Sequence, residues 1–243
     1  MCIRDRSSEG FVLSLKPHNE KSYILEVLTR EHGKHKGLIR GVHSKNLRSI
    51  IEPGNEITAH WSGRLETHLG NYSIEGIKSW SSLILAEKEK LCALTSACSL
   101  ITNTLAEKQP NENIYSGLKS LIQILTLGRN DWIKDYIIWE LNLLTEIGYG
   151  LDLSKCAVTS KKDNLVFVSP STGSAVTEIG AGDYKSKLLK LPSFLIDHKI
   201  IYSKEDVLDG LNLSEFFLKK WFFLPNNLHF PESRNRLKDM FII

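Results

Sequence analysis

The residues of this chain that are best placed to do chemistry are cations clustered near its amino-terminal end. The window from Leu28 to Arg64 contains seven basic and three acidic residues, a net charge of +4, together with four histidines. The rest of the chain has 24 basic and 25 acidic residues, so the overall excess of +3 is concentrated in this window. Such a concentration is typical of a surface that binds a polyanion. We therefore predict nucleic-acid contacts from Lys34, Lys36, Arg40, Lys45, Arg48 and Arg64.

Aromatic residues accompany these cations, and single-stranded nucleic acid is usually held by a positive groove with aromatic rings on which bases stack. Tyr23, Trp61 and Tyr72 lie in the same region. The segment Gly41–Arg48 begins with glycine and carries two of the cations, so we expect a flexible loop that contacts phosphate. The alternative is a solvated positive face over a core that contains the aromatic rings. We expect Trp61 and Tyr23 to be core residues.

The cysteines and histidines predict no metal site. The four cysteines (Cys2, Cys92, Cys98 and Cys156) lack the spacing of a disulfide framework, which favours free thiols in a reducing cytoplasm. A structural zinc ion needs four ligands, and Thr159 stands where a Cys156-x-x-Cys pair would need its second thiol. The expected distal pair, around Thr172–Glu178, contains neither Cys nor His. His32 and His35 lie in a lysine-rich turn that disfavours a cation.

Catalytic signatures are also missing from the sequence. There is no phosphate-binding P-loop and no G-x-S-x-G nucleophile motif. Gly148-Tyr-Gly150 ends a predicted helix, so it is unlike a dinucleotide-binding turn, and the carboxylates are too dispersed to pair two metal ions. We therefore predict a binding protein with no catalytic residues and no cofactor.

A second candidate site lies near the carboxyl end. The run Leu211–Leu224 is strongly apolar but contains two adjacent lysines. Packing inside a helical domain explains this composition, as does a groove that accepts a short apolar peptide beside a basic rim. On the second interpretation, the groove residues are Phe216, Lys219, Lys220 and Trp221.

The elements that position these residues fall into two classes. Five short β-rich runs separated by turns predict a small closed barrel, of OB-fold or SH3-like type, with strands at residues 10–15, 22–28, 36–41, 56–61 and 71–77. From about Ser82 the apolar spacing becomes helical, and Gly148 and Gly150 end a helix that is apolar on most faces. Short strands follow, and helical spacing resumes from Tyr184, with a strong helix over Lys204–Leu224.

These patterns predict an α+β protein with several domains. We expect a disordered or non-native leader at 1–8, a barrel at 9–80, a helical domain at 81–150, a small β element at 151–182 and carboxyl-terminal helices at 183–243. The last of these should pack with the helical domain. No apolar run is long enough to cross a bilayer, so we expect no membrane contact.

The order and spacing of several short motifs resemble the RecO family of bacterial recombination mediators. These motifs are Glu9–Leu13, Gly33–Gly41, Pro53-Gly54, Ile147–Leu153, Phe167–Pro170, Ser171–Gly173, Leu191-Pro192, Phe216–Leu218 and Pro231–Arg234. The resemblance implies an amino-terminal OB-fold, a helical domain and a zinc-knuckle-like element. Because three ligand positions lack Cys or His, the chain is similar to the members that build this element without metal.

The resemblance also implies a function and a set of partners. Members of this family bind single- and double-stranded DNA, anneal complementary strands and, with RecR, help RecA load onto DNA coated with single-stranded DNA-binding protein (SSB). They also dock the acidic, apolar tail of SSB. A cytoplasmic, nucleoid-associated protein follows from this role. Two alternatives stay open, namely an OB-fold module that binds RNA and a protein adaptor with no role in DNA repair. An enzyme is a third, and it would need carboxylates or a metal ion that converge in the fold.

Overall fold

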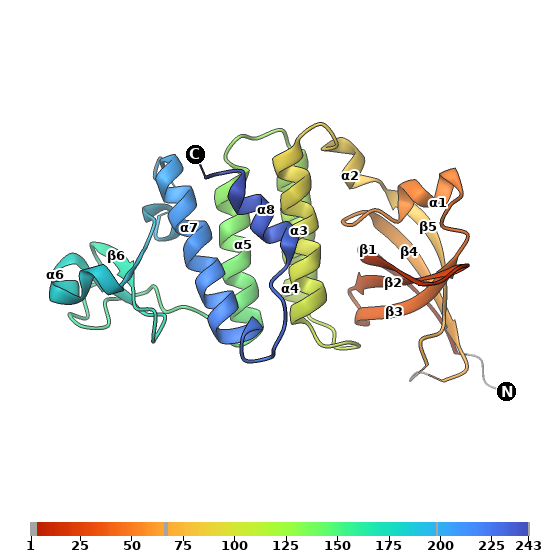
Figure 1. Ribbon diagram of the computed structural model, residues 1–243, viewed down its shortest axis with the longest axis horizontal. Coiled ribbons are helices and arrows are strands. Elements are labelled where there is room, and N and C mark those ends of the chain that lie inside the picture. The colour runs from red at the N-terminus through yellow and green to blue at the C-terminus, as the bar shows by residue number, and fades with distance from the viewer. Residues whose placement is uncertain (1–3, 66–67, 198, 243) are drawn as a thin grey trace. The chain divides into compact units, whose positions relative to one another are not determined.

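Five strands close into a barrel in the computed structural model, which describes residues 4–65, 68–197 and 199–242. The strands are β1 (Arg4–Asn19), β2 (Ser22–Thr29), β3 (Gly33–Arg40), β4 (Glu56–Gly63) and β5 (Asn71–Lys78). Their order around the barrel is β1-β2-β3-β5-β4, and β1 pairs with β4 to close it (Figure 1). The predicted α+β class and five-stranded, OB-type barrel are confirmed.

Strand β1 begins earlier than the sequence pattern indicates. Residues Arg4 to Ser8 pair with β4, in a register that places Arg4 opposite Gly63 and Ser8 opposite Ala59. Their backbone groups are therefore satisfied by the ladder, and the expected disordered leader is wrong from Arg4 onward. The remaining leader residues, 1–3, lie outside the described part of the chain.

The barrel is filled by alternate side chains of its strands, as a closed sheet with one buried face requires. Trp61 is 2% exposed and donates a hydrogen bond from Nε1 to the carbonyl of Leu69 at 2.9 Å. Tyr23 is half-buried and packs against the same core. Both residues are therefore core components, as expected.

The segment after β3 is partly helical, which corrects the expected flexible loop. Gly41 adopts a positive φ of 73°, and helix α1 (Lys45–Ile50) follows. Ser44 caps this helix by accepting a hydrogen bond from the backbone N–H of Leu47. The cap and the apolar contact of Leu47 with the barrel core order a stretch whose composition suggested mobility.

The first three helices after the barrel fold with it as one compact unit. They are α2 (Trp80–Leu83), α3 (Lys88–Thr104) and α4 (Glu112–Thr126). Gly54 has a φ of 85°, and a Cβ there would lie 2.6 Å from the side chain of Leu94 in α3, so the turn backbone lies directly against this helix. The unit comprises residues 1–129 and, from the end of the chain, Pro231–Arg234. The boundary between compact units thus lies after Arg129, whereas the change of pattern lies near Trp80.

A second unit comprises residues 130–230 and 235–243. Helix α5 (Trp132–Glu146) packs against α7 (Lys204–Phe217), as Figure 1 shows, and Gly210 of α7 approaches Ile137 of α5. Helix α7 continues as a π-helix, η3 (Leu218–Phe223), and the last helix is α8 (Glu232–Asp239). The buried carboxylate of Glu140 accepts hydrogen bonds from the hydroxyls of Tyr136 at 2.9 Å and Ser214 at 2.6 Å.

Residues 155–190 form a small lobe of this second unit. Its sheet has the order β7-β6-β8, from β6 (Leu165–Val168), β7 (Ala175–Thr177) and β8 (Leu189–Lys190). Between β7 and β8 lie the short helices α6 (Glu178–Ala181) and η1 (Gly182–Lys187). The expectation of continued helix from Tyr184 is wrong, because η1 is a single 3₁₀ segment and β8 then pairs with β6. After the short η2 (Ser193–Leu195), helical structure resumes at α7, which begins with a Ser203–Asp206 capping box.

Candidate nucleic-acid interface

Lys34, the first cation predicted to contact nucleic acid, is directed into the protein. It is only 5% exposed, and its Nζ donates a hydrogen bond to the carbonyl of Thr102 at 2.5 Å. Burial lowers the pKa of this lysine from its ordinary value. Thr102 lies in the last turn of α3, where carbonyls lack helical partners and a cation is favourable. Lys34 therefore stabilises the fold and is removed from the predicted interface.

Lys36 is half-buried, and its charge is already neutralised. Its Nζ lies 3.2 Å from a carboxylate oxygen of Glu26 and 2.7 Å from one of Glu107. The hydrogen bond to Glu107 is the main reason why the pKa of Lys36 is raised. A phosphate would have to compete with two carboxylates for this ammonium, so Lys36 is a weak candidate.

Three of the predicted cations gather on an exposed corner of the barrel. Arg40 ends β3, while Lys45 and Arg48 are three residues apart on α1 and therefore share one side of that helix. None of the three forms an ion pair with another residue that the structure describes. Tyr23 and His43 lie at the same corner, with the tyrosine hydroxyl 3.3 Å from His43 Nε2. We call Arg40, Lys45 and Arg48 the barrel cations.

A groove of about 350 Å³ runs beside the barrel cations. Arg40 of β3 and Leu47 of α1 border it, and β5 supplies its polar residues Asn71 and Ser73. The ring of Tyr72 forms part of its lining, packed so closely on Gly37 that a Cβ there would lie 2.5 Å from the ring. The groove exists because β3 and β5 share only one paired position, Leu38 with Asn71, at this seam of the barrel. Its lining combines an exposed cation, amide and hydroxyl groups, and an apolar wall, which are the groups that a nucleic-acid strand needs.

Arg64 lies apart from the barrel cations. It directly follows β4 and is exposed, without an ion pair in the described ranges. Strands β3 and β4 flank β5 on opposite sides, so Arg40 and Arg64 stand on either side of the first residues of β5. A path that joins them would cross Asn71 and Ser73.

His35, one of the two turn histidines, belongs to the barrel interior. It is 2% exposed, its ring meets that of Trp61 edge-on, and its Nδ1 lies 3.0 Å from the hydroxyl of Tyr72. The guanidinium of Arg6 donates to its Nε2. Burial, assisted by the charge of Arg6, lowers the pKa of His35 to about 4. This imidazole is therefore a structural group of the barrel interior.

Cys156 is surrounded by groups that are unsuited to hold zinc. Its sulfur is 1% exposed and accepts hydrogen bonds from the backbone N–H groups of Thr177 at 3.3 Å and Thr159 at 3.4 Å. Burial raises the pKa of the thiol, but these and the hydroxyl contacts of the two threonines outweigh it and lower the pKa to about 6. A Cβ on Gly180 would lie 3.0 Å from the sulfur. Within the described residues, no group of three or more His, Cys, Asp or Glu side chains could hold a metal ion.

The predicted peptide-groove residues divide between two sides of the α7–η3 helix. Phe216 and Lys220 lie together, with the Lys220 ammonium 5.4 Å from the ring centre, and Lys220 also donates to the carbonyl of Pro170 at 2.5 Å. The half-buried Trp221 packs on Phe217 and Tyr149, with ring centres 4.4 Å and 6.3 Å apart. These aromatic rings and the exposed Lys220 form an apolar surface with a basic edge.

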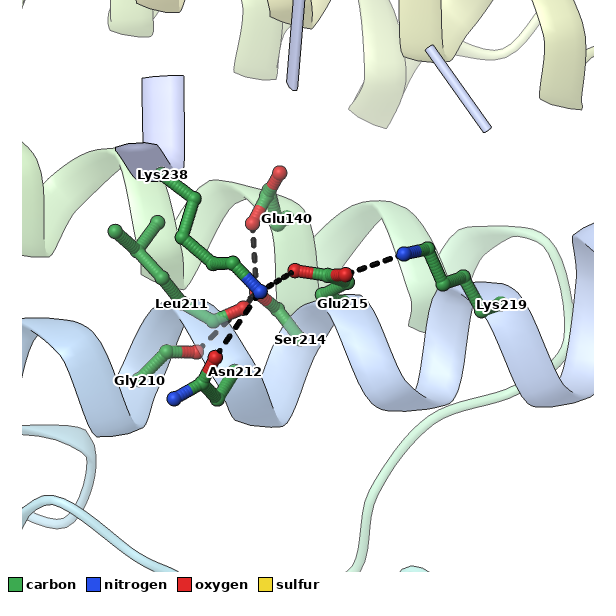
Figure 2. Close-up of polar contacts among 8 residues, drawn as sticks. All are labelled: Glu140, Gly210, Leu211, Asn212, Ser214, Glu215, Lys219 and Lys238. Carbon is green, nitrogen blue, oxygen red and sulfur yellow. Dashed lines mark hydrogen bonds and ion pairs between the residues drawn. The ribbon is translucent and has the colours of Figure 1, made fainter. Parts of the chain in front are cut away.

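Lys219 points to another set of neighbours, as Figure 2 shows. It forms an ion pair with Glu215, whose second oxygen lies 2.6 Å from the Nζ of Lys238. Its ammonium also lies 4.8 Å from the ring centre of Phe230. These two lysines lower the pKa of the Glu215 carboxyl against the effect of burial. Lys219 is therefore held by Glu215 of the same continuous helix and by the ring of Phe230, and these partners differ from those of Lys220 and Trp221.

No helix in the described ranges is long and apolar enough to span a membrane. Comparisons with known proteins agree with the architecture. Residues 4–80 match the family domain described as "Recombination protein O N terminal", and residues 87–221 match "Recombination protein O C terminal". The division between these two matches falls near Trp80, where the sequence pattern changes.

Full-length relatives show the same similarity. The chain is 35% identical over 235 residues to the DNA repair protein RecO of Rhodospirillum rubrum, with 95% of this chain and 93% of that protein covered. It is 36% identical over 233 residues to the protein of the same name from Cereibacter sphaeroides, with 96% of each covered. The corresponding protein of Rhodopseudomonas palustris is 37% identical over 236 residues, with 94% and 92% covered. The chain therefore belongs to the RecO family of DNA repair and recombination proteins.

Proposed function

We propose that this protein binds single- and double-stranded DNA through the barrel cations and the adjacent groove, and that Arg64 extends this contact. The observation that supports the proposal most directly is that Arg40, Lys45 and Arg48 are exposed and form no ion pair with any residue that the structure describes. Arg40 also borders a groove lined by Asn71 and Ser73. Unpaired cations exchange their mobile counterions for phosphates, which yields affinity with little sequence preference.

The proposed activity is the annealing of complementary strands, which requires no covalent chemistry. Two strands repel each other through their phosphates, and a positive surface lowers that repulsion by neutralising some of them. In the cell this activity would serve recombination: with RecR, the protein would assist RecA loading onto DNA coated with SSB. The protein would act in the cytoplasm, associated with the nucleoid.

A salt titration tests the DNA contact. The barrel variant Arg40→Ala/Lys45→Ala/Arg48→Ala is compared with the parent and with a control, Lys88→Ala/Lys199→Ala/Lys204→Ala, which removes the same charge from three other exposed lysines. Each lost phosphate contact reduces the slope of log affinity against log salt by about 0.7 for single strands, so the barrel variant should lose about 2 from its slope. The control should keep the parent's slope. Equal slopes for barrel variant and parent would refute the contact.

We further propose that the tail of SSB binds at Phe216, Lys220 and Trp221, with Lys219 outside the contact. An acidic, apolar peptide needs an apolar surface and a cation that is not already held by a carboxylate. Lys220 meets this requirement because its partners are a carbonyl and a ring, whereas Lys219 is paired with Glu215.

Fluorescence anisotropy with a labelled tail peptide tests this docking. Trp221→Ala and Lys220→Ala should each weaken binding about tenfold or more, which corresponds to a loss of about 1.4 kcal/mol. Lys219→Ala is the matched control on the neighbouring residue and should change the affinity much less. Larger effects from Lys219→Ala than from Lys220→Ala would assign the contact to the other side of the helix.

Two further measurements separate this function from its alternatives. A competition between RNA and DNA oligonucleotides of equal length should favour DNA or show no preference, because phosphate contacts dominate; strong preference for RNA would support an RNA-binding module. An annealing assay with and without SSB and RecR tests the mediator role. A protein adaptor would show neither salt-dependent binding nor annealing.

A further inference from the structure

The small lobe carries a second concentration of positive charge. Residues 155–190 contain six lysines against Asp163, Glu178 and Asp183, a net charge of +3 in 36 residues. The net charge of the chain outside Leu28–Arg64 does not reveal this excess, because acidic residues elsewhere balance the lysines of the lobe. The lobe is therefore a basic region that lies outside the barrel.

Four of the six lobe lysines are available to a ligand. Lys185 is paired with Glu178, and Lys190 with Glu205 and Asp209. The others, which we call the lobe lysines, are exposed and form no ion pair within the described part of the chain: Lys155, Lys161, Lys162 and Lys187. Unpaired ammonium groups so close in the chain repel one another, and an external anion would relieve that repulsion.

Backbone contacts hold three of these lysines in one tight loop. The carbonyl of Lys161 accepts a hydrogen bond from the N–H of Cys156 at 2.7 Å, which closes the loop between Lys155 and Lys162. The same loop packs on α6, since a Cβ on Gly180 would lie 3.4 Å from the Cβ of Val158. The cations are thus held by an ordered loop.

Exposed apolar and aromatic side chains adjoin the lobe lysines. Val158 is 67% exposed at the tip of the loop, and Ile179 is 81% exposed on the α6 that the loop contacts. In η1, Tyr184 is 68% exposed, and the ammonium of Lys187 lies 5.6 Å from its ring centre. An exposed aromatic ring beside unpaired cations is the combination on which single-stranded nucleic acid stacks and neutralises its phosphates.

We propose that the lobe is a second binding surface for single-stranded nucleic acid, with the lobe lysines on phosphates and Tyr184 under a base. This inference extends the proposed annealing function, because a protein with two such surfaces holds one strand on the barrel and presents the other from the lobe. The charge and the exposed ring favour a nucleic-acid strand over an acidic peptide, which has no bases to stack.

The test compares a lobe variant, Lys155→Ala/Lys161→Ala/Lys162→Ala, with the control Lys88→Ala/Lys199→Ala/Lys204→Ala and with the barrel variant. All substituted residues are exposed, and unchanged circular dichroism and melting temperature establish that each variant folds. In binding to an oligonucleotide at 0.1 M salt, each lost phosphate contact lowers the affinity of the lobe about fivefold, so the parent and the control should bind two strands per chain and the lobe variant only one. Annealing should slow in parallel.

The outcomes separate this inference from the proposed barrel site. If the barrel variant loses DNA binding and the lobe variant matches the control, the inference is overturned and the barrel site stands. If the lobe variant loses binding while the barrel variant does not, the lobe is the site and the barrel proposal fails. A lobe variant that loses only the SSB tail peptide would also overturn the inference, because the surface would then bind an acidic protein segment.

A crosslinking measurement tests the aromatic contact independently of charge. A single-stranded oligonucleotide that contains iodouracil should crosslink on irradiation to a peptide that includes Tyr184, and Tyr184→Leu should abolish that product. The whole chain of 243 residues is used, so no fragment of it has to fold alone. Crosslinks confined to barrel peptides would contradict the proposal.

Discussion

The ammonium of Lys34 stabilises the carboxyl end of α3, although its residue type and neighbours indicate a surface cation. Its charge lies against the carbonyl of Thr102 in a position that is 5% exposed. Cations near the last turn of a helix interact favourably with its unpaired carbonyls. A charge count cannot reveal this role, because it depends on which way one strand residue faces.

A substitution of Lys34 should separate stability from binding. Lys34→Met keeps most of the apolar stem but leaves the carbonyl unpaired, and should lower the free energy of unfolding by about 1–2 kcal/mol. The slope of the DNA salt titration should stay unchanged. Urea unfolding and anisotropy measure the two quantities, and Arg48→Met is the matched control with the opposite pattern. A reduced slope for Lys34→Met would return Lys34 to the interface.

His35 should make the stability of the barrel depend on pH. In the folded protein its pKa is lowered to about 4, from the 6.5 that applies when it is unfolded. The unfolded chain therefore binds the proton more readily, so this contribution is complete above pH 6.5 and is lost as the pH falls toward 4. The shift corresponds to at most about 3 kcal/mol.

Urea unfolding between pH 4 and 7 tests this dependence. His35→Gln retains a polar side chain that does not titrate, so its free energy of unfolding should fall less steeply over this window than that of the parent. The control is His18→Gln, which replaces an exposed histidine. Its free energy of unfolding should depend on pH as that of the parent does. Parallel curves for parent and His35→Gln would show that other groups set the acid limit.

At the scale of elements, the strands of the barrel were predictable because each buries one face and each is bounded by turns. All five expected ranges lie within or overlap the observed strands. The helical structure before Ile50 could not be predicted in the same way. Its order depends on the Ser44 cap and on the contact of Leu47 with the barrel core. The false helix at Tyr184 has a similar origin, since β8 is set by pairing with β6. Local spacing carries no information on such distant partners.

The lobe retains the spacing of a metal site without its ligands. Cys156 and Thr159 are three apart, as are Thr177 and Gly180, and all four positions converge on the Cys156 sulfur. Tetrahedral zinc is typically bound by two such pairs of thiolates. The triple variant Thr159→Cys/Thr177→Cys/Gly180→Cys should therefore bind one Zn²⁺ per chain.

Metal analysis after desalting measures this stoichiometry, with the parent protein as control. The bound ion should also raise the melting temperature of the variant, and a chelator should reverse that increase, because metal affinity contributes directly to folding. A variant that retains no zinc after desalting would show that the four positions cannot open to the tetrahedral geometry.

At the scale of the whole molecule, the chain divides after Arg129, but its first unit also includes Pro231–Arg234. Arg234 is fully buried, and the carbonyl of Ser233 accepts a hydrogen bond from the thiol of Cys92 at 3.3 Å. The sequence pattern could not predict that Pro231–Arg234 would pack with the first unit. A short polar helix has no periodicity that identifies its partner. A boundary drawn at a change of pattern therefore differs from the boundary of a compact unit.

Arg234→Ala tests the importance of this segment. Loss of a buried guanidinium should lower the free energy of unfolding by about 3 kcal/mol and increase alkylation of Cys92, measured by peptide mapping. Arg236→Ala, an exposed arginine two residues later, is the matched control and should alter neither quantity. Equal alkylation of Cys92 in both variants would show that the segment is dispensable for the first unit.

The inclusion of Pro231–Arg234 in the first unit also has a consequence for biosynthesis. The ribosome makes residues 130–230 between the two parts of the amino-terminal unit, so this unit stays unfinished while the intervening residues are translated, even though its barrel strands emerge first. The nascent chain must keep the surface beneath Arg234 uncovered until Pro231–Arg234 emerge, and a product truncated before Pro231 would lack the piece that completes it. Translation of the intervening residues is thereby a condition for the maturation of the barrel and its helices.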